Sequence, residues 1–434
     1  MRSYGLRSLA VLLTALLGAP TVLPASEDDL DTERTLSEIL QDKRLQEAKA
    51  SGDVSKRDTT VEQELRERQK EQLEGTTKSR RAILPQIGFS PEKGASGGIK
   101  FTDRDVGGLT LDVSGLAAQQ GQYKGKLSLV APDVADGWVI LAGFASFETD
   151  PARRFFGLGN NDVGPDEISR NGQKRTNGRF VGAVRLTRRF AAVASLAYND
   201  VRIRRGERHE DTPSTKDLFP DLVGIRGGKT NPLSAALIFD DRDDVTRPTR
   251  GWNVIAKFDY VPRSFSNDFD FNRYIFEASY LYPLLTRRQV LGARVGGEYI
   301  DTKRRHTPYF EFSSLGGGDD MRGYFLDRFR GKAKVIAGGE YRLKIFDFDF
   351  FDIWNVKIDG VGFGDAGRVF LSSDDMASEF GIDETRLPAL KDKMRFSYGG
   401  GVRFALGEAT IARVDVGFSD EQKGLVYLVF GHTF

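Results

Sequence analysis

A glycine-rich loop between two alternating segments carries the residue with the clearest chemical potential, Arg322. The loop covers residues 315–324 and has the sequence LGGGDDMRGY. Glycine lets the backbone turn tightly, and a guanidinium that is carried into a confined space needs a carboxylate partner. Glu340 and Asp365 follow on the next two expected strands, on the face that we assign to the inside of a barrel. Both are therefore candidate partners of Arg322.

Catalytic chemistry has little support in this sequence. The three histidines, His209, His306 and His432, lie in two loops and on the last expected strand, without metal-ligand spacing or a neighbouring nucleophile motif. The chain has no cysteine, so it forms neither a disulfide framework nor a thiolate metal site. We expect a protein that is not an enzyme, with no catalytic residue, no metal and no cofactor.

The overall charge is balanced, with 63 basic and 62 acidic residues. No electrostatic footprint for nucleic acid follows from such a balance. Mean hydropathy is −0.38, which by itself is typical of a soluble protein. A transmembrane β-barrel gives the same average, because residues that face lipid alternate with residues that face the lumen.

Residues 1–25 are typical of an export signal. Arg2 and Arg7 supply positive charge, and an apolar run over residues 9–17 follows. The alternative is a membrane-anchoring helix, but the run is interrupted at Gly18 and is shorter than the roughly 20 residues that span a bilayer. We expect cleavage and export.

Residues 26–81 form a segment dense in Glu, Lys, Arg and Gln. Thr35 and Glu38 form a capping-box pattern that predicts a helix start. The apolar residues are too sparse for a core: Leu36, Ile39, Leu40, Val61, Leu65 and Leu73. We expect a charged arm in the periplasm, with one or two solvated helices or partial disorder. The alternative is a short coiled-coil contact with a periplasmic partner.

From residue 82 onward, short segments alternate between apolar and polar residues. Within residues 411–418, apolar side chains alternate with Arg413 and Asp415. The same pattern recurs in residues 252–260, 273–280, 291–299 and 396–406. A period of two with charges on one face indicates strands that meet two different environments.

A soluble β-sandwich also alternates, with its apolar face in the core. Aromatic residues near expected strand ends favour a membrane barrel instead, as in interfacial girdles: Trp252, Tyr260, Tyr274 and Tyr299. The final segment, residues 425–434, alternates as a strand and ends on an aromatic residue. Phe430 and Phe434 in this segment are typical of the assembly signal of outer-membrane barrels.

The lengths of the connections between the expected strands indicate the topology. Long polar segments alternate with short links near residues 107, 189, 283 and 407; the long segments are residues 148–176, 203–231, 301–330 and 370–393. Bacterial barrels have long extracellular loops and tight periplasmic turns. We therefore expect an all-β fold, a transmembrane antiparallel β-barrel of about 16 strands over residues 82–434.

Several motifs in this order resemble the BamA/TamA superfamily of outer-membrane assembly barrels, the bacterial surface antigen family. They are Asp240-Asp241-Arg242-Asp243 with Pro248 and Gly251, then Met321-Arg322-Gly323-Tyr324, then Phe363-Gly364-Asp365-Ala366-Gly367, and the ending Gly431-His432-Thr433-Phe434. Two further stretches fit the style of the family, residues 84–98 and residues 155–160.

The resemblance implies a place for the arginine loop. In the family, the arginine of the Arg-Gly-Phe/Tyr element lies on the sixth extracellular loop, which folds into the lumen and pairs with acidic residues on the following strands. Carried over by position, Arg322, beside Gly323 and Tyr324, would pair with Asp365, with Glu340 as a second partner. The alternative is that Arg322 is an exposed loop charge.

The resemblance also places a periplasmic motif at residues 240–251. Turn chemistry alone accounts for the same residues, and we favour that interpretation. Asp240 and Asp243 cap the turn around Arg242, Pro248 fixes the bend and Gly251 begins the next strand.

The family implies a function at the Gram-negative outer membrane: assisting the insertion, assembly or translocation of polypeptide, or of lipid. The expected mechanism is strand addition at a weak seam between the first strand, near residues 85–90, and the last, residues 425–434. Expected partners are outer-membrane lipid and client outer-membrane or secreted polypeptides. Assembly members carry periplasmic POTRA domains, for which residues 26–81 have no room. The alternative functions are a passive channel and a surface scaffold, and a soluble exported β-sandwich is the alternative fold.

Overall fold

The computed structural model describes most of the chain, namely residues 31–50, 81–161, 168–206, 212–244, 247–286, 288–303, 305–350, 354–380, 393–406 and 410–430. The expected export signal at residues 1–25 and the expected terminal aromatic Phe434 lie outside the described residues. Within the described part, no helix is long and apolar enough to cross a membrane.

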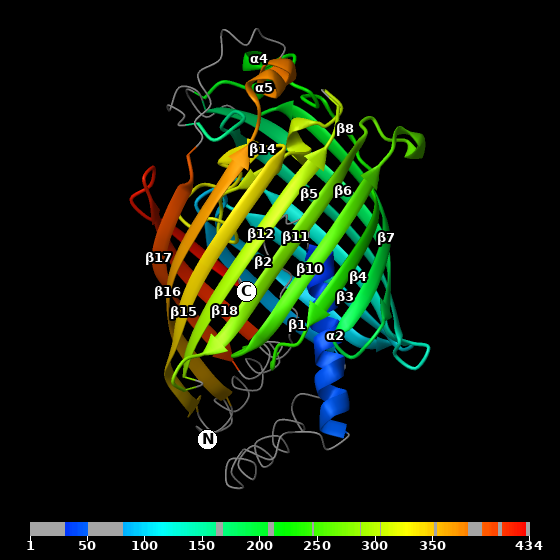
Figure 1. Cartoon of the computed structure of the whole chain (residues 1–434), viewed down its shortest axis with the longest axis vertical. Helices are drawn as coiled ribbons and strands as arrows, with labels where there is room; N and C mark the ends of the chain where they lie inside the picture. The colour runs from blue at the N-terminus through cyan, green and yellow to red at the C-terminus, as the bar shows by residue number, and fades with distance from the viewer. Residues whose placement is uncertain are drawn as a thin grey trace, which may run out of the picture.

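A closed antiparallel β-barrel forms the body of the protein (Figure 1). Seventeen strands make one sheet, in which β8 and β9 both pair with β7 and so share one place in a barrel of sixteen strands. The strands are β1 (Arg81–Ser90), β2 (Gly94–Val106), β3 (Leu109–Ala118), β4 (Tyr123–Val134), β5 (Val139–Phe155), β6 (Ser169–Arg185), β7 (Phe190–Arg205), β8 (Gly227–Lys229), β9 (Leu233–Asp240), β10 (Gly251–Val261), β11 (Phe271–Pro283), β12 (Gln289–Asp301), β15 (Ala333–Phe350), β16 (Trp354–Phe370), β17 (Arg395–Leu406), β18 (Thr410–Ser419) and β19 (Leu425–Phe430). The expected all-β barrel is confirmed.

The connections carry a few short elements. They are α4 (Thr215–Leu218), the 3-10 turns η2 (Arg263–Phe265) and η3 (Tyr309–Glu311), the hairpin strands β13 (Ser313–Leu315) and β14 (Phe329–Gly331), and α5 (Ser373–Phe380). Both α4 and α5 lie at the upper rim in Figure 1, the end that carries the long connections. This rim is the extracellular end by the rule that long loops face outward.

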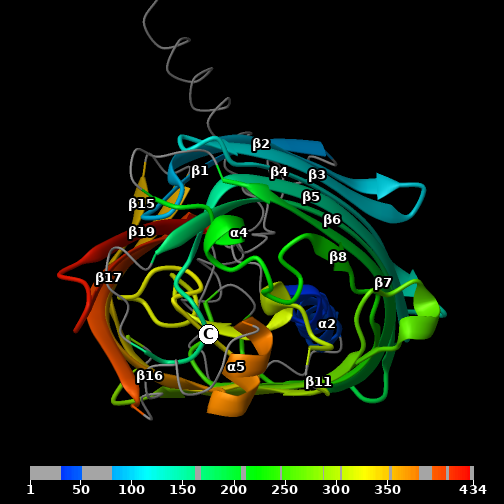
Figure 2. The ribbon, with the colours of Figure 1, turned by 90° about the horizontal axis from the view of Figure 1, so that it is seen from above.

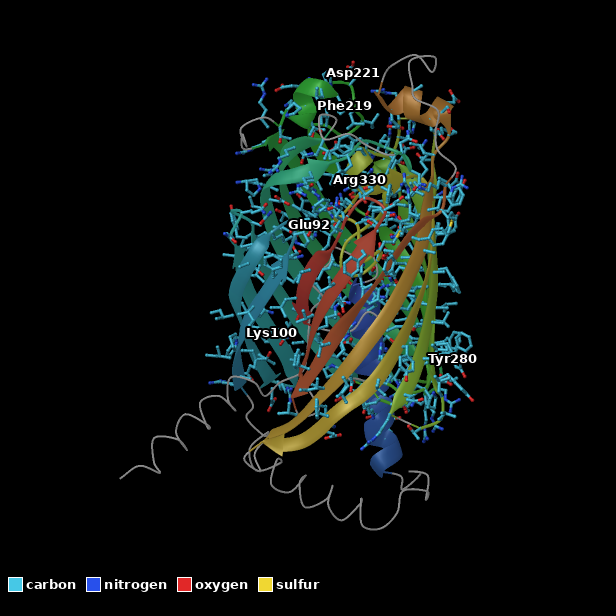
Figure 3. The ribbon with its side chains drawn as sticks, turned by 90° about the vertical axis from the view of Figure 1, so that its left-hand side faces the viewer. Glu92, Lys100, Phe219, Asp221, Tyr280 and Arg330 are labelled. Carbon is cyan, nitrogen blue, oxygen red and sulfur yellow. The ribbon has the colours of Figure 1, made fainter. Side chains whose placement is uncertain are left out.

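Alternation along the strands separates an apolar outer wall from a polar lumen. On β7, Leu196 and Tyr198 are 51% and 43% exposed, whereas Ala197 and Val201 between and beyond them are buried. The expected girdle aromatics Trp252, Tyr260, Tyr274 and Tyr299 all lie on the exposed face. Figure 3 shows Tyr280 on the same outer wall near the lower rim, where its ring centroid lies 4.4 Å from that of Trp252. An outer surface of this kind requires lipid.

Two of the expected long loops are shorter than the sequence pattern indicated. β5 continues to Phe155 and β6 begins at Ser169, so much of residues 148–176 is strand. β7 likewise continues to Arg205, inside the expected loop 203–231. These strands rise above the apolar belt, where both faces of the sheet carry polar residues and the alternation that marks a strand is lost.

A helix, α2 (Asp31–Ala50), lies inside the barrel (Figure 2). Leu36 and Leu40 are buried against the inner wall, in a cluster that includes Ile140, Val181 and Ile238. The expectation of a solvated arm is therefore wrong for residues 31–50, because the barrel wall supplies the apolar partner that the arm lacks. Thr35 lies within the helix, so the expected helix start at this residue is also wrong.

The alternation on β7 gives a direct test, because the chain has no native cysteine. We expect Leu196→Cys to react with a membrane-dissolved thiol reagent and Ala197→Cys to be protected, since the two side chains face lipid and lumen. Labelling of the chain reconstituted in lipid vesicles measures this. Equal labelling at both positions would contradict a lipid-facing outer wall.

Candidate functional site

The connection between β12 and β15 folds into the barrel rather than away from it (Figure 2). Its hairpin β13–β14 packs in a buried cluster with Met321 and Tyr324. Gly317 donates its N–H to the Tyr324 carbonyl at 3.0 Å, which closes the loop tightly. Gly323 has φ +152°, and a Cβ there would lie 2.6 Å from the Phe418 carbonyl oxygen. Glycine at this position therefore allows the loop to lie directly against the wall.

Arg322 is fully buried at the centre of this loop and makes three charge-assisted hydrogen bonds. Its Nε and Nη2 donate to Asp365 Oδ2 and Oδ1, each at 3.0 Å. Its Nη1 donates to Glu340 Oε2 at 2.9 Å. The guanidinium carbon also lies 3.5 Å from the centroid of the Phe363 ring. The structure thus brings the arginine and both predicted carboxylates together, in the bidentate geometry that makes such pairs strong.

Further charges surround this pair and balance it. Glu340 also accepts hydrogen bonds from Arg342 Nε at 2.6 Å and from Arg403 Nη2 at 3.3 Å. Arg403 Nη1 bonds in turn to Asp415 Oδ1 at 2.5 Å. Asp365 lies within 3.8 Å of Arg294 Nη2. Each buried carboxylate is therefore shared between two or more cations, which offsets the cost of removing the charges from water.

Arg403 and Arg413, on the neighbouring strands β17 and β18, also belong to this network of lumen charges. Arg403 and Arg413 lie directly opposite each other in the β17–β18 register, where two like charges repel. Arg403 bonds to Asp415, and Arg413 pairs with Asp319 of the loop. Both arginines occupy inward-facing positions on neighbouring strands, and this pattern in the sequence could have indicated that they lie together.

Tyr324 ties the loop to the last two strands. Its hydroxyl donates to Asp420 Oδ1 at 2.5 Å, in the turn between β18 and β19, and its carbonyl accepts from the Tyr427 hydroxyl at 2.9 Å. Partial burial favours the neutral acid, but hydrogen bonds from Tyr324 and Lys393 outweigh it and lower the pKa of Asp420. The ionised carboxylate is therefore a strong acceptor for the tyrosine.

The motif at residues 240–251 combines a turn with a docking site. Asp243 Oδ1 accepts from the Thr249 N–H at 2.8 Å, and buried Pro248 precedes this residue, as turn chemistry predicts. Gly251 has φ +111°, and a Cβ there would lie 2.7 Å from the Arg242 Cα. Turn chemistry accounts for these residues but not for Asp240 and Arg242.

Asp240 and Arg242 instead hold α2. The Asp240 carboxylate accepts from Arg242 Nη2 and from Ser37 Oγ, both at 2.7 Å, and from Asn253 Nδ2 at 2.9 Å. Gln41 Nε2 donates to the Arg242 carbonyl at 3.0 Å. The sequence pattern did not reveal this contact, because the two segments lie about two hundred positions apart in the chain.

Ion pairs fix the remaining length of α2. Arg34 Nη2 lies 2.5 Å from Glu277 Oε2 near one end, and Glu47 Oε1 and Oε2 accept from Arg185 at 2.6 and 2.9 Å near the other. Glu33, which is buried, lies 3.6 Å from Lys257 Nζ. The charges that made this arm look solvated therefore meet opposite charges of the lumen wall.

Phe430 and the three histidines are the remaining residues that the sequence analysis named. Phe430 is the last residue of β19, where its backbone pairs with Ala412, and its role in assembly stays a prediction. His306 Nδ1 lies 2.8 Å from Asp270 Oδ1, whereas His209 and His432 lie outside the described residues. In the described ranges, no group of three or more potential metal ligands is gathered to hold an ion.

A closed barrel with an apolar outer wall, a charged lumen and an inward loop held by a buried arginine defines a transmembrane β-barrel of the outer-membrane class. Residues 107–434 match the Omp85 superfamily domain, and the chain belongs to the Omp85 superfamily. The predicted relationship to BamA and TamA is thereby confirmed. An Omp85 barrel implies a location in the Gram-negative outer membrane.

Solved structures support the same fold. BamA from Haemophilus ducreyi lacking POTRA domains 1–3 is 16% identical with a TM-score of 0.58, over 81% of this chain and 70% of that chain. CdiB from Escherichia coli is 12% identical with a TM-score of 0.55, over 80% of this chain and 62% of that one. No curated protein sequence matches the chain.

The buried ion pair predicts a large effect of one substitution. Arg322→Ala leaves Asp365 and Glu340 without a principal partner in a buried site, which destabilises by about 3–5 kcal/mol. We expect the folded band on a heat-modifiability gel to unfold at a clearly lower temperature. Arg205→Ala is the control, because Arg205 forms an exposed pair with Asp217 and such pairs contribute about 1 kcal/mol at most. Equal unfolding temperatures for the two variants would contradict a stabilising role for the buried ion pairs of Arg322.

Proposed function

We propose that this protein assists the insertion or translocation of polypeptide at the outer membrane, without enzymatic chemistry, by offering an open strand edge at the β1–β19 seam. The proposal rests on the sparse pairing between β1 and β19. Over the positions where both strands are described, residues 87–90 of β1 and 427–430 of β19, a single register pair joins them, Phe89 with Leu428. A seam with few ladder hydrogen bonds opens at low cost and exposes backbone donors and acceptors to an incoming strand.

The composition of β1 supports the same proposal. Pro85 lies within this strand and has no N–H to donate, and proline in sheets is confined to edge strands, strand starts and bulges. The membership of the chain in the Omp85 superfamily adds support, because its barrels are typically insertion or translocation proteins. The proposal includes three kinds of partner: client polypeptides, surrounding lipid and a periplasmic partner of the charged arm, residues 26–81. A polypeptide is favoured over a lipid as the client, because an open strand edge offers hydrogen bonds that a polypeptide backbone can complete.

Two inward elements disfavour the alternative of a passive channel. Both α2 and the loop that carries Arg322 lie within the ring of strands (Figure 2). Both are held by buried ion pairs and hydrogen bonds to the wall. A route through the lumen would require one of them to leave, whereas the seam lies on the opposite side of the contacts that hold α2, which involve β4 to β11.

Tethering the seam tests the proposal. We expect Phe89→Cys with Leu428→Cys, once cross-linked by oxidation or by a short bismaleimide, to abolish function, because the edges remain closed. The measurement is an inventory of outer-membrane proteins in cells that are depleted of the wild-type chain and express the variant. Reduction of a disulfide tether should restore the inventory.

The matched control is a cross-link in a regular ladder. Val254 and Phe239 are register partners on β10 and β9, so Val254→Cys with Phe239→Cys tethers two strands that the proposal keeps paired. This variant should retain function. A tethered seam that supports a normal inventory would exclude lateral opening, and depletion that changes no other outer-membrane protein would exclude the assembly function.

Conductance tests the role of α2 in closing the lumen. We expect the full chain in a planar bilayer to show few large openings, and Leu36→Asp with Leu40→Asp to show large and steady ones, because charged residues at these buried positions release the helix. Asp42→Ala, on the exposed side of α2, is the control. Large steady openings of the unaltered chain would favour a passive channel instead.

A further inference from the structure

Four basic side chains gather on the outer wall at the extracellular end of β6, β7 and β8. We call Lys174, Arg202, Arg204 and Lys229 the outer basic cluster. The first three are exposed and Lys229 is partly exposed. Arg202 lies directly opposite Lys174 in the β6–β7 register, so the cluster spans neighbouring strands rather than one loop. None of these residues takes part in the ion pairs of Arg322 or in the contacts of α2 described above.

Strand parity places the cluster on the lipid-facing side. Arg202 and Arg204 share their face of β7 with Tyr198, which is exposed, whereas Val201 and Ile203 on the other face are buried in an interior cluster. The β6–β7 ladder runs without a register shift, so this parity holds along its whole length. The guanidinium groups of both arginines therefore project from the outer wall.

The cluster lies above the apolar wall, close to the layer of lipid headgroups. Arg202 follows the exposed aromatic residue Tyr198 by four positions, which is about 13 Å along the strand at roughly 3.3 Å per residue. With the usual strand tilt this becomes about 10 Å along the membrane normal. A headgroup layer extends roughly 5–8 Å beyond each side of the hydrocarbon core, so the Arg202 backbone lies a few Å beyond that layer, and its long side chain can reach back to the headgroups.

The cluster carries an excess of positive charge. Among the ion pairs of the described residues, one involves the cluster, Arg202 Nη2 with Asp200 Oδ2 at 3.0 Å. Lys174 and Arg202 are like charges directly across a strand pair, an arrangement that destabilises a sheet unless an anion lies between them. A ligand with negative charge would remove this repulsion.

Two register partners of the arginines are glycines. Gly172 lies opposite Arg204, and Gly227 lies opposite Arg202 on its other side. Below them, Tyr198 presents an aromatic ring, 5.9 Å from Lys229 Nζ, and exposed Leu196 continues the apolar wall. Cations above apolar side chains fit an amphiphile with an anionic head.

We propose that the outer basic cluster binds the phosphate-bearing headgroup of a lipid in the outer leaflet, whose acyl chains lie against Leu196, Tyr198 and Phe180. Arg202 and Arg204 supply forked donors that match phosphate oxygens, and Lys174 adds a point charge on the neighbouring strand. The lipid would occupy one sector of the wall, beside β6 to β8, and not the seam between β1 and β19.

Titration of the purified full-length chain with bisphosphorylated lipid A, followed by native mass spectrometry, tests this site. Each cationic side chain near a membrane surface contributes about fivefold to affinity. We therefore expect Arg202→Gln with Arg204→Gln to weaken binding by roughly 25-fold. Arg202→Lys, which keeps the charge, should stay within a few fold of the unaltered chain. A heat-modifiability gel checks that each variant is folded.

The matched control uses the other end of the same hairpin. Arg188 and Arg189 are exposed in the turn between β6 and β7, at the periplasmic rim. Arg188→Gln with Arg189→Gln removes the same charge and should leave lipid A binding unchanged. Equal losses in the two double variants would show nonspecific charge attraction and would overturn the proposal.

Two further ligands separate a lipid from a free anion. Lipid A without its phosphates should bind the unaltered chain as weakly as bisphosphorylated lipid A binds the Arg202 and Arg204 double variant. Inorganic phosphate at matched concentration should not displace bisphosphorylated lipid A. Complete displacement by inorganic phosphate would assign the cluster to a free anion, and undiminished binding of the dephosphorylated lipid would exclude phosphate recognition.

Discussion

Charge neutralisation inside the barrel is the constraint on which the rest of the structure depends. The strands turn arginine, lysine, aspartate and glutamate side chains into a confined lumen, where an unpaired charge is costly. Arg322 is the centre of this network because it is fully buried and bonds to two carboxylates on two strands. The loop brings charges of both signs to the wall, because Arg322 pairs with Asp365 and Glu340 while Asp319 pairs with Arg413.

The same constraint explains why α2 lies inside the barrel. On β9 and β10, Asp240 and Asn253 are directed inward and bond to Ser37 of the helix. Glu33 lies close to Lys257 in the same way. The loop with Arg322 neutralises the wall formed by β15 to β18, and α2 neutralises the wall formed by β6 to β11. The lumen is thus divided between two inward elements that occupy different sectors (Figure 2).

Most of what could be predicted about the barrel came from the period-two alternation of apolar and polar residues. It placed residues such as Tyr274 on the outer wall and Arg413 on the inner one, because a strand in a membrane has two different solvents. The pairing of Arg322 with Asp365 followed from parity combined with the resemblance to the family. The position of α2 was not predictable in this way, because Leu36 and Leu40 form no core among themselves. Their partners, such as Ile238, are distant in sequence, and no local pattern records the contact.

The contacts of α2 also determine an order of events during folding. The helix precedes every strand in the chain, yet Ser37 binds Asp240 and Asn253, and Arg34 binds Glu277. These sites exist only after β9, β10 and β11 have paired, and loop closure over such separations is slow compared with forming a hairpin. A helix that precedes the strands in the chain is therefore among the last elements to reach its place, and it enters a lumen that the strands have already enclosed.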